Sequence, residues 1–264
     1  MDANASLKTP ADIRRLIRDG HYSGHTSGFA PGYVQANVVI LPKKYAYDFL
    51  GFCQNNPRAC PLLGHTEAGA TELPRLAQDL DIRTDIPKYR VYELGQKVSE
   101  QTEISSLWRK DLVTFLIGCS FSFEEALLAD GIEVRNITEN SNVPMYVTNQ
   151  ACHRSGVFGG NMVVSMRPMT PKDAIRAIQI CSRFPSVHGA PVHFGDPQAI
   201  GINDIKRPNF GDAVTIKPGE VPVFWPCGVT PQVAIATARP DFCITHSPGH
   251  MLILDIKNTA LSSF

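Results

Sequence analysis

Short strand-like runs alternate with helix start signals along the whole chain, and this alternation restricts the folds open to it. Thr9-Pro10, Thr170-Pro171 and Thr230-Pro231 each place a capping hydroxyl before a proline at the first helical position. The first two add an aspartate three residues after the threonine, which approximates a capping box. Because helices and strands interleave, the sequence predicts a mixed α/β fold.

The spacing of apolar residues predicts the individual elements. Helices are expected from Pro10 to Gly20, over 43–55, and after Thr170. The helix after Thr170 is expected to bury the apolar residues that share one face, namely Ala174, Ile175, Ile178 and Cys181. Runs rich in β-branched and aromatic residues predict strands at 34–41, 88–94, 96–102, 113–117, 143–148, 163–169, 191–194, 213–216, 221–225, 242–245 and 251–256.

The length of 264 residues, at roughly 150 residues per domain, fits one large domain or two modest ones. The stretch 131–196 has its own order of strand, strand, helix and strand between turn-rich joins. We expect it to be a small α+β subdomain inserted into a main α/β domain, which is formed by residues 1–130 and 197–264.

The charge balance excludes several partners. Lys plus Arg and Asp plus Glu both number 25, so the chain lacks the excess of basic residues that binds nucleic acids and anionic membranes.

The longest nearly apolar run, 112–123, is shorter than the roughly 18 residues of a membrane helix, and the first residues lack a secretory signal. We therefore expect a cytoplasmic protein with a small-molecule partner and no nucleic-acid or membrane partner. Whether it forms a homo-oligomer stays open.

The run 118–125, GCSFSFEE, joins a predicted strand directly to a predicted helix start. The amides of Cys119 and Ser122 could form an anion cradle, and Ser122-x-x-Glu125 also has the form of a capping box. A third interpretation makes Ser120 a hydrolase nucleophile, although Ser122 stands where a nucleophile elbow has glycine. Glu124 is a candidate acid or base, with a solvated first-turn acid as the alternative.

Two further stretches carry candidate binding groups. In 227–232, CGVTPQ, a strand again ends at a helix start, where Cys227 and Thr230 could contact a substrate or simply belong to the core. On the strand from Tyr33, the side chains of Tyr33, Gln35 and Asn37 share one face. This polar row lines either a ligand cleft or a solvated face of the sheet.

Histidines lie in two Gly- and Pro-rich stretches, 185–196 and 244–251. His188 or His246 could act on a substrate, and both could equally be hydrogen-bonded structural groups. His193 and Asp196 lie close to His188, but the H-E-x-x-H arrangement is absent, so no metal site is predicted. The seven cysteines are scattered without a C-x-x-C pair, which favours reduced thiols. No phosphate-binding or dinucleotide-binding glycine motif occurs, and no cofactor is predicted.

Long ordered strings of residues resemble the D-glutamate cyclase family, whose bacterial members are called hydro-lyases. The resemblance covers nearly the whole chain, from Ile13 to Asp255. The strings that carry it are GYVQAN at 32–37, CPLL at 60–63, DIRTD at 81–85, GCSFSFE at 118–124, NVPMY at 142–146, VSMRP at 164–168, HGAPVH at 188–193 and CGVTPQ at 227–232.

The resemblance implies a three-layer αβα core with a smaller two-layer part, and dehydration of D-glutamate to 5-oxo-D-proline. Such a reaction needs a base, for which His188 or His246 fits, and an acid, for which Glu124 fits. Arg83 or Arg167 is the candidate for a bidentate contact with the α-carboxylate. A divalent cation has no support in the sequence. The alternatives are a protein that binds a small carboxylate without chemistry, and the Ser120 hydrolase.

Overall fold

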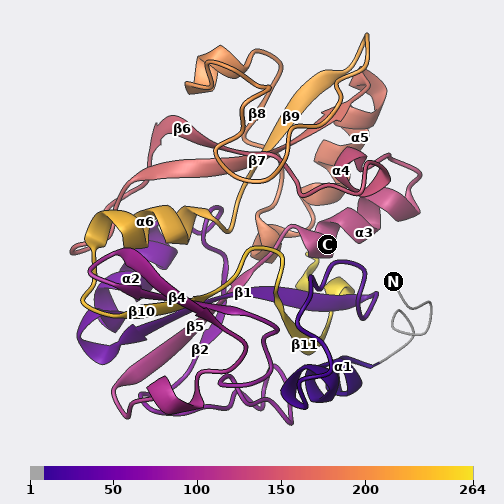
Figure 1. Cartoon of the computed structure of the whole chain (residues 1–264). Helices are drawn as coiled ribbons and strands as arrows, with labels where there is room; N and C mark the ends of the chain where they lie inside the picture. Colours follow the sequence, from indigo (N-terminus) through magenta and orange to yellow (C-terminus); the bar gives the residue numbers. More distant parts are fainter. Residues whose placement is uncertain (1–8, 264) are drawn as a thin grey trace.

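The computed structural model describes residues 9–263, and within them two antiparallel sheets are packed with helices. The predicted mixed α/β class is therefore confirmed. Figure 1 shows the two sheets one above the other, with the larger sheet at the bottom and α6 (Thr230–Ala238) between them. No helix in the described part of the chain combines the length and the apolar character needed to cross a membrane.

The larger sheet is built around β1 (Tyr33–Pro42), the longest strand. Its path is β2-β5-β1-β10-β3-β4, and β11 also pairs with β1. All of these pairs are antiparallel. The other strands are β2 (Leu62–His65), β3 (Tyr89–Glu93), β4 (Gln96–Gln101), β5 (Leu112–Gly118), β10 (Cys243–His246) and β11 (Leu252–Lys257).

The alternation of side chains on β1 divides the sheet into two faces. Val34, Ala36, Val38 and Ile40 face an apolar core that is closed by the irregular segments 73–86 and 104–108. Val39 and Leu41 face the opposite side, where α2 (Lys43–Asn55) and α6 cover the sheet. Gln35 and Asn37 share that second side nearer the start of the strand, and both are buried.

The second sheet has the order β6-β7-β9-β8 and is also antiparallel. Its strands are β6 (Met145–Ala151), β7 (Asn161–Met169), β8 (His193–Phe194) and β9 (Val221–Pro226), and its helices are α3 (Phe121–Ala129), α4 (Arg135–Thr138) and α5 (Pro171–Cys181). Phe123 and Leu127 of α3 pack on Val223 and Trp225 of β9. This sheet therefore draws its strands from residues 145–226, and the subdomain boundary at 196 stays a prediction.

Several local predictions need correction. Residues 213–216 form no strand, because Val214 and Ile216 pack on the second sheet without joining a ladder. The helix at 230 is not capped by Thr230, which lies inside its first turn and donates to the carbonyl of Cys227 at 2.8 Å. Ile175 is 62% exposed, because α5 buries Ala174, Ala177 and Cys181 instead.

The capping box expected at Ser122 and Glu125 is also absent. Ser120 precedes α3 in a helical conformation (φ −58°, ψ −21°), so no extended residue is left to act as a cap. Glu125 instead accepts hydrogen bonds from Gly32 and from Asn258. The capping hydroxyls of Thr9 and Thr170 are confirmed, since each accepts the amide of the aspartate three residues later.

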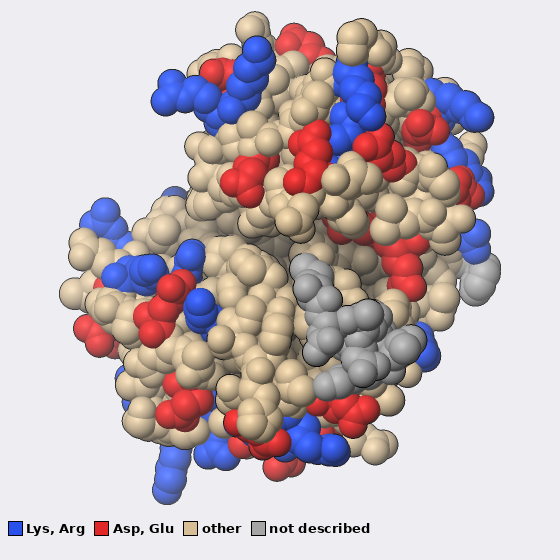
Figure 2. All heavy atoms as spheres, turned by 45° about the vertical axis from the view of Figure 1, so that its right-hand side comes forward, with Lys and Arg blue, Asp and Glu red and all other residues tan. Residues whose placement is uncertain are grey.

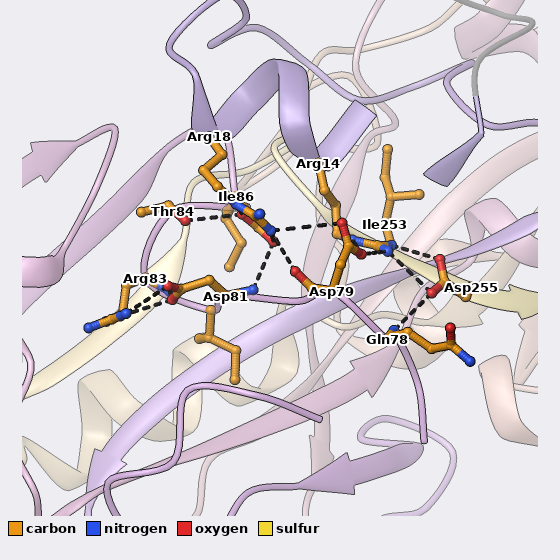
Figure 3. A network of polar contacts seen from close by, with 12 residues as sticks. Arg14, Arg18, Gln78, Asp79, Asp81, Arg83, Thr84, Ile86, Ile253 and Asp255 are labelled. Atoms are coloured by element: carbon orange, nitrogen blue, oxygen red, sulfur yellow. Dashed lines mark hydrogen bonds and ion pairs between the residues drawn. The ribbon is translucent and has the colours of Figure 1, made fainter. Parts of the chain in front are cut away.

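A chain of ion pairs fixes α1 (Pro10–Arg18) and the irregular segment 78–86 to the edge of the larger sheet (Figure 3). Arg14 is fully buried, pairs with Asp79 and Asp255, and donates to the carbonyl of Ile253 at 2.9 Å. Arg18 pairs with Asp85 at 2.6 Å. These contacts replace the backbone ladder that an irregular segment cannot form.

Replacing Arg14 with Met should lower the free energy of unfolding by about 3 kcal/mol, because Asp79 and Asp255 lose a buried partner. Arg15 is the matched control on the same helix: its side chain is 64% exposed and lies 3.6 Å from Asp12. Arg15→Met should cost less than about 1 kcal/mol. Urea denaturation of both variants measures the difference, and equal losses would contradict a structural role for this network.

Candidate active site

Two strand-to-helix junctions meet at Asn37 in the middle of the larger sheet. β5 leads through Cys119 into α3, and β9 leads through Cys227 into α6. Asn37 donates from Nδ2 to the carbonyl of Gly118 at 2.9 Å. A Cβ atom added at Gly228 would lie only 2.3 Å from the same Nδ2, so glycine permits this close approach. The starts of the two helices are therefore neighbours. We call residues 118–124 and 227–230, with Asn37, Arg167 and His188, the junction site.

At each helix start, the amide before the first backbone hydrogen bond has no carbonyl partner and donates to a thiol instead. The first backbone hydrogen bonds run from Ser122 to the Cys119 carbonyl at 3.2 Å, and from Thr230 to the Cys227 carbonyl at 3.0 Å. The amides of Phe121 and Val229 lie before these bonds and approach the thiols of Cys119 and Cys227. Free amides at a helix start attract anions, because their partial positive charges add to that of the helix dipole.

The junction site contains a buried ion pair. Arg167 on β7 is fully buried and pairs with Glu124 on α3. Its guanidinium also donates to Ser120 Oγ at 3.2 Å and to Ser165 Oγ at 3.0 Å. The rings of Phe123 and Trp225 lie 5.3 Å from the guanidinium carbon and complete its enclosure. Such a pair persists in the interior because each charge is matched and hydrogen-bonded.

His188 has a left-handed backbone conformation (φ 84°) and ends the short 3-10 turn at 185–187, which follows α5. Its Nδ1 lies 2.8 Å from the carbonyl oxygen of Arg58. A carbonyl only accepts, so we assign the proton to Nδ1, which leaves Nε2 with a lone pair. Nε2 is buried and has no hydrogen-bond partner. Burial lowers the pKa of His188 to about 4, and the nearby charge of Arg167 contributes to that shift.

Two more buried polar atoms lack a partner near the same helix starts. Ser122 Oγ lies in the first turn of α3, and Gln35 Oε1 lies two residues before Asn37 on the same face of β1. The Gln35 amide nitrogen is used, since it donates to the carbonyls of Thr26 and Phe29. An unpaired buried group is costly, so the atoms at Gln35, Ser122 and His188 are candidate contacts for a ligand.

Both junction thiols are buried and protonated. Burial raises the pKa of Cys119 to about 12, against the effect of a hydrogen bond from the Phe121 backbone. Burial likewise raises the pKa of Cys227 to about 11, against a hydrogen bond from the Val229 backbone. The expected lowering of the Cys227 pKa by its helix start is therefore outweighed by burial.

The structure brings together most of the residues that the sequence singles out. The junction site contains Asn37, Cys119, Ser120, Ser122, Glu124, Arg167, His188, Cys227 and Thr230, with Gln35 beside it. The hydroxyl of Ser120 contacts the Arg167 guanidinium, and among the described residues no imidazole is hydrogen-bonded to it. Figure 2 shows the molecular surface recessed between the two halves of the molecule.

Three of the singled-out residues lie elsewhere. Arg83 pairs with Asp81 at 2.7 Å in the network around α1. The ammonium nitrogen of Lys257 lies over the ring of Tyr33, 3.7 Å from the ring centre. His246 accepts the amide of Val38 at Nδ1 at 3.1 Å, and burial lowers its pKa to about 4. Sequence reasoning missed Ser165 and Trp225, although the spacing of Ser165 and Arg167 places both on one face of a strand.

Among the described residues, no group of three or more His, Cys, Asp or Glu side chains is arranged to hold a metal ion. The polar atoms of the junction site are instead hydroxyls, amides, thiols and one paired carboxylate. This set suits an organic anion that is bound by hydrogen bonds.

Comparison with known proteins gives consistent matches over the chain. The family model described as D-glutamate cyclase matches residues 113–255. A "putative hydro-lyase" of Bordetella pertussis is 60% identical over 247 residues, which cover 94% of this chain and 89% of that protein. Proteins of the same description are 57% identical in Staphylococcus haemolyticus, over 98% of this chain and 99% of that protein, and 58% identical in Aliivibrio fischeri, over 97% of both.

A solved structure of a nitrogen repressor-like protein from Methanococcus jannaschii aligns with 95% of this chain and 99% of its own length. The TM-score is 0.38 and the sequence identity is 10%, so this similarity carries no argument about the protein.

Replacing Arg167 with Met should lower the free energy of unfolding by about 3–5 kcal/mol, because the Glu124 carboxylate would be left buried without a partner. Adding Glu124→Gln to this variant should restore part of the loss. The control is the exposed pair of Arg176 and Asp130 at 2.7 Å, where Arg176→Met should cost less than about 1 kcal/mol. Urea denaturation of the wild type, the single variants Arg167→Met and Glu124→Gln, and the double variant measures the coupling, and additive single effects would contradict it.

Stability should also fall as the pH drops from about 6.5 towards 4. The unfolded chain protonates His188 and His246 at the ordinary pKa near 6.5, whereas the folded protein does so only near 4. Acid therefore favours unfolding by about 1.4 kcal/mol per pH unit for each histidine. His188→Gln should reduce this slope in urea denaturation across pH 7 to 4.5, and the exposed control His153→Gln should leave it unchanged. If His188→Gln left the pH dependence of the unfolding free energy unchanged, the lowered pKa assigned to His188 would be refuted.

Proposed function

The chain belongs to the D-glutamate cyclase family, and from this membership we propose that it dehydrates D-glutamate to 5-oxo-D-proline. Relatives over most of its length are named as hydro-lyases, and the protein is accordingly a carbon–oxygen lyase. The observation that carries the proposal is the junction site itself. It combines two neighbouring helix starts, a buried imidazole nitrogen without a hydrogen-bond partner, and the buried ion pair of Arg167 and Glu124.

The proposed reaction joins the α-nitrogen of glutamate to its own γ-carboxyl carbon. One C–N bond forms, one C–O bond breaks, and the oxygen leaves as water with two protons that come from the ammonium group. The nucleophile and the electrophile belong to one molecule, so holding the substrate in a ring-like conformation supplies a large part of the acceleration.

The two helix starts suit the two carboxylates of the substrate. In the proposed complex, the start of α3 receives the γ-carboxylate and the start of α6 receives the α-carboxylate. The unpartnered Ser122 hydroxyl and the positive end of the α3 dipole would then stabilise the negative charge that grows on the γ-carboxyl oxygens during attack. Arg167 donates to Ser120 Oγ, so the proton of that hydroxyl is also available to the same oxygens.

His188 is the proposed base that removes a proton from the α-ammonium group. Its Nε2 carries a lone pair, and because its pKa is lowered to about 4 the imidazole is neutral at pH 7. The same proton can then pass to the departing oxygen. Glu124 stays paired with Arg167 and holds the guanidinium against Ser120, so we assign it to positioning in this scheme.

The proposal is tested by incubating the purified protein with D- or L-glutamate and separating 5-oxoproline enantiomers by chiral chromatography, with and without Mn²⁺ or Mg²⁺. We expect 5-oxo-D-proline from D-glutamate, and no 5-oxo-L-proline from either enantiomer. His188→Gln should lower kcat by about 100-fold or more, because the base is lost. Arg176→Lys, on the exposed surface, is the control and should keep the wild-type rate.

Two outcomes would overturn the proposal in different ways. Absence of product from both enantiomers under all conditions would exclude glutamate cyclisation. Saturable binding of D-glutamate without product, measured by calorimetry, would favour the alternative of a carboxylate-binding protein.

A further inference from the structure

The two junctions carry thiols at equivalent backbone positions. The carbonyl of Cys119 accepts the first backbone hydrogen bond of α3, from the amide three residues later. The carbonyl of Cys227 does the same for α6. Each thiol also receives a hydrogen bond from the backbone two residues further on, at Phe121 and at Val229. The chain thus presents the same strand–cysteine–helix arrangement twice.

The two cysteines lie on neighbouring helix starts, and the thiol of Cys119 is within electrostatic range of Cys227. Cys119 follows β5 of the larger sheet, whereas Cys227 follows β9 of the second sheet. Asn37 touches the neighbours of both, since it donates to the Gly118 carbonyl and lies against Gly228. Each thiol is within electrostatic range of both Glu124 and Arg167. These contacts bring the two cysteines close to each other and to the same ion pair.

Two buried polar atoms without a hydrogen-bond partner lie close to the same helix starts. Ser122 is 1% exposed and His188 is 0% exposed, and neither Ser122 Oγ nor His188 Nε2 has a hydrogen-bond partner. Ser122 lies one helical turn after Cys119, and the turn at 186–187 that carries His188 packs on Gly118. These atoms point to a ligand between the thiols, and the cyclisation scheme above leaves both thiols unused.

We propose that Cys119 and Cys227 are an acid–base pair that removes and returns the α-hydrogen of glutamate from opposite sides. The protein would then also be a glutamate racemase. The inference rests on the proposed function for its substrate. One sulfur, as thiolate, takes the proton from Cα while the electron pair of the broken C–H bond moves into the α-carboxylate. The other thiol then gives its proton to the opposite side of Cα, so no oxidant or reductant is needed.

The pair needs one thiolate at the start of each turnover. Burial keeps both thiols protonated, so one proton must leave to water when the substrate enters. The ammonium group of glutamate, Arg167 and the helix-start amides all favour the thiolate that results. After inversion the two sulfurs have exchanged roles.

The test follows the α-hydrogen in deuterated water. D-glutamate or L-glutamate is incubated with the wild-type protein, and loss of the α-proton signal is measured by NMR together with chiral analysis of the amino acid. We expect both enantiomers to exchange and to interconvert. Cys119→Ser and Cys227→Ser should each lower interconversion at least 100-fold. Each should also abolish exchange for only one enantiomer, with opposite preference in the two variants.

The matched control is Cys152→Ser, since Cys152 lies outside the junction site beside α2 and should leave exchange within 2-fold of wild type. Cys119→Ala and Cys227→Ala repeat the test if a serine variant unfolds. No exchange with either enantiomer in the wild-type protein would overturn the inference, as would equal loss for both enantiomers in each folded variant. Exchange without 5-oxoproline would support the inference while refuting cyclisation, and 5-oxoproline without exchange would do the reverse.

Discussion

The buried ion pair of Arg167 and Glu124 is the interaction on which the rest of the site depends. Arg167 belongs to the second sheet, and Glu124 belongs to the helix that continues from β5 of the larger sheet. The pair therefore links the two sheets at the place where the helix starts meet. Removing either partner would leave a charge in a region closed by Phe123 and Trp225, so the link tolerates little change.

Close backbone contact surrounds this link. A side chain at Gly118 would lie 2.3 Å from the Ser186 carbonyl, and one at Gly228 would collide with Asn37. The two glycines let the histidine-bearing turn and both helix starts come together around a small volume. Close backbone packing at the two glycines therefore determines the shape of the site. Its side chains are positioned by a few buried hydrogen bonds, such as that from Asn37 to the Gly118 carbonyl.

The sequence predicts those features that depend on neighbours along the chain. The alternation in β1 and the capping hydroxyls of Thr9 and Thr170 are local, and the structure confirms them. The strand expected at 213–216 is wrong because its apolar residues pack without a strand partner. Likewise, Arg83 and Arg167 are equivalent candidates in the sequence. Only tertiary contacts separate them, since Asp81 pairs with Arg83 at the edge and Glu124 pairs with Arg167 in the interior.

The charge state of the junction site bears on what it can select. Arg167 is matched by Glu124, and because burial lowers the pKa of His188 and raises that of Cys119 and Cys227, these three groups are uncharged near pH 7. The fixed attraction for an anion then comes from the two helix starts, whose partial charges are small and directional. Such a site favours a ligand with two carboxylates at the right separation over a singly charged acid, which could use only one of the helix starts. An additional ammonium group on the ligand would offset part of the cost of burying two carboxylates together, because opposite charges attract more strongly away from water. We therefore propose an amino dicarboxylate as the ligand, in preference to a simple dicarboxylate of the same length.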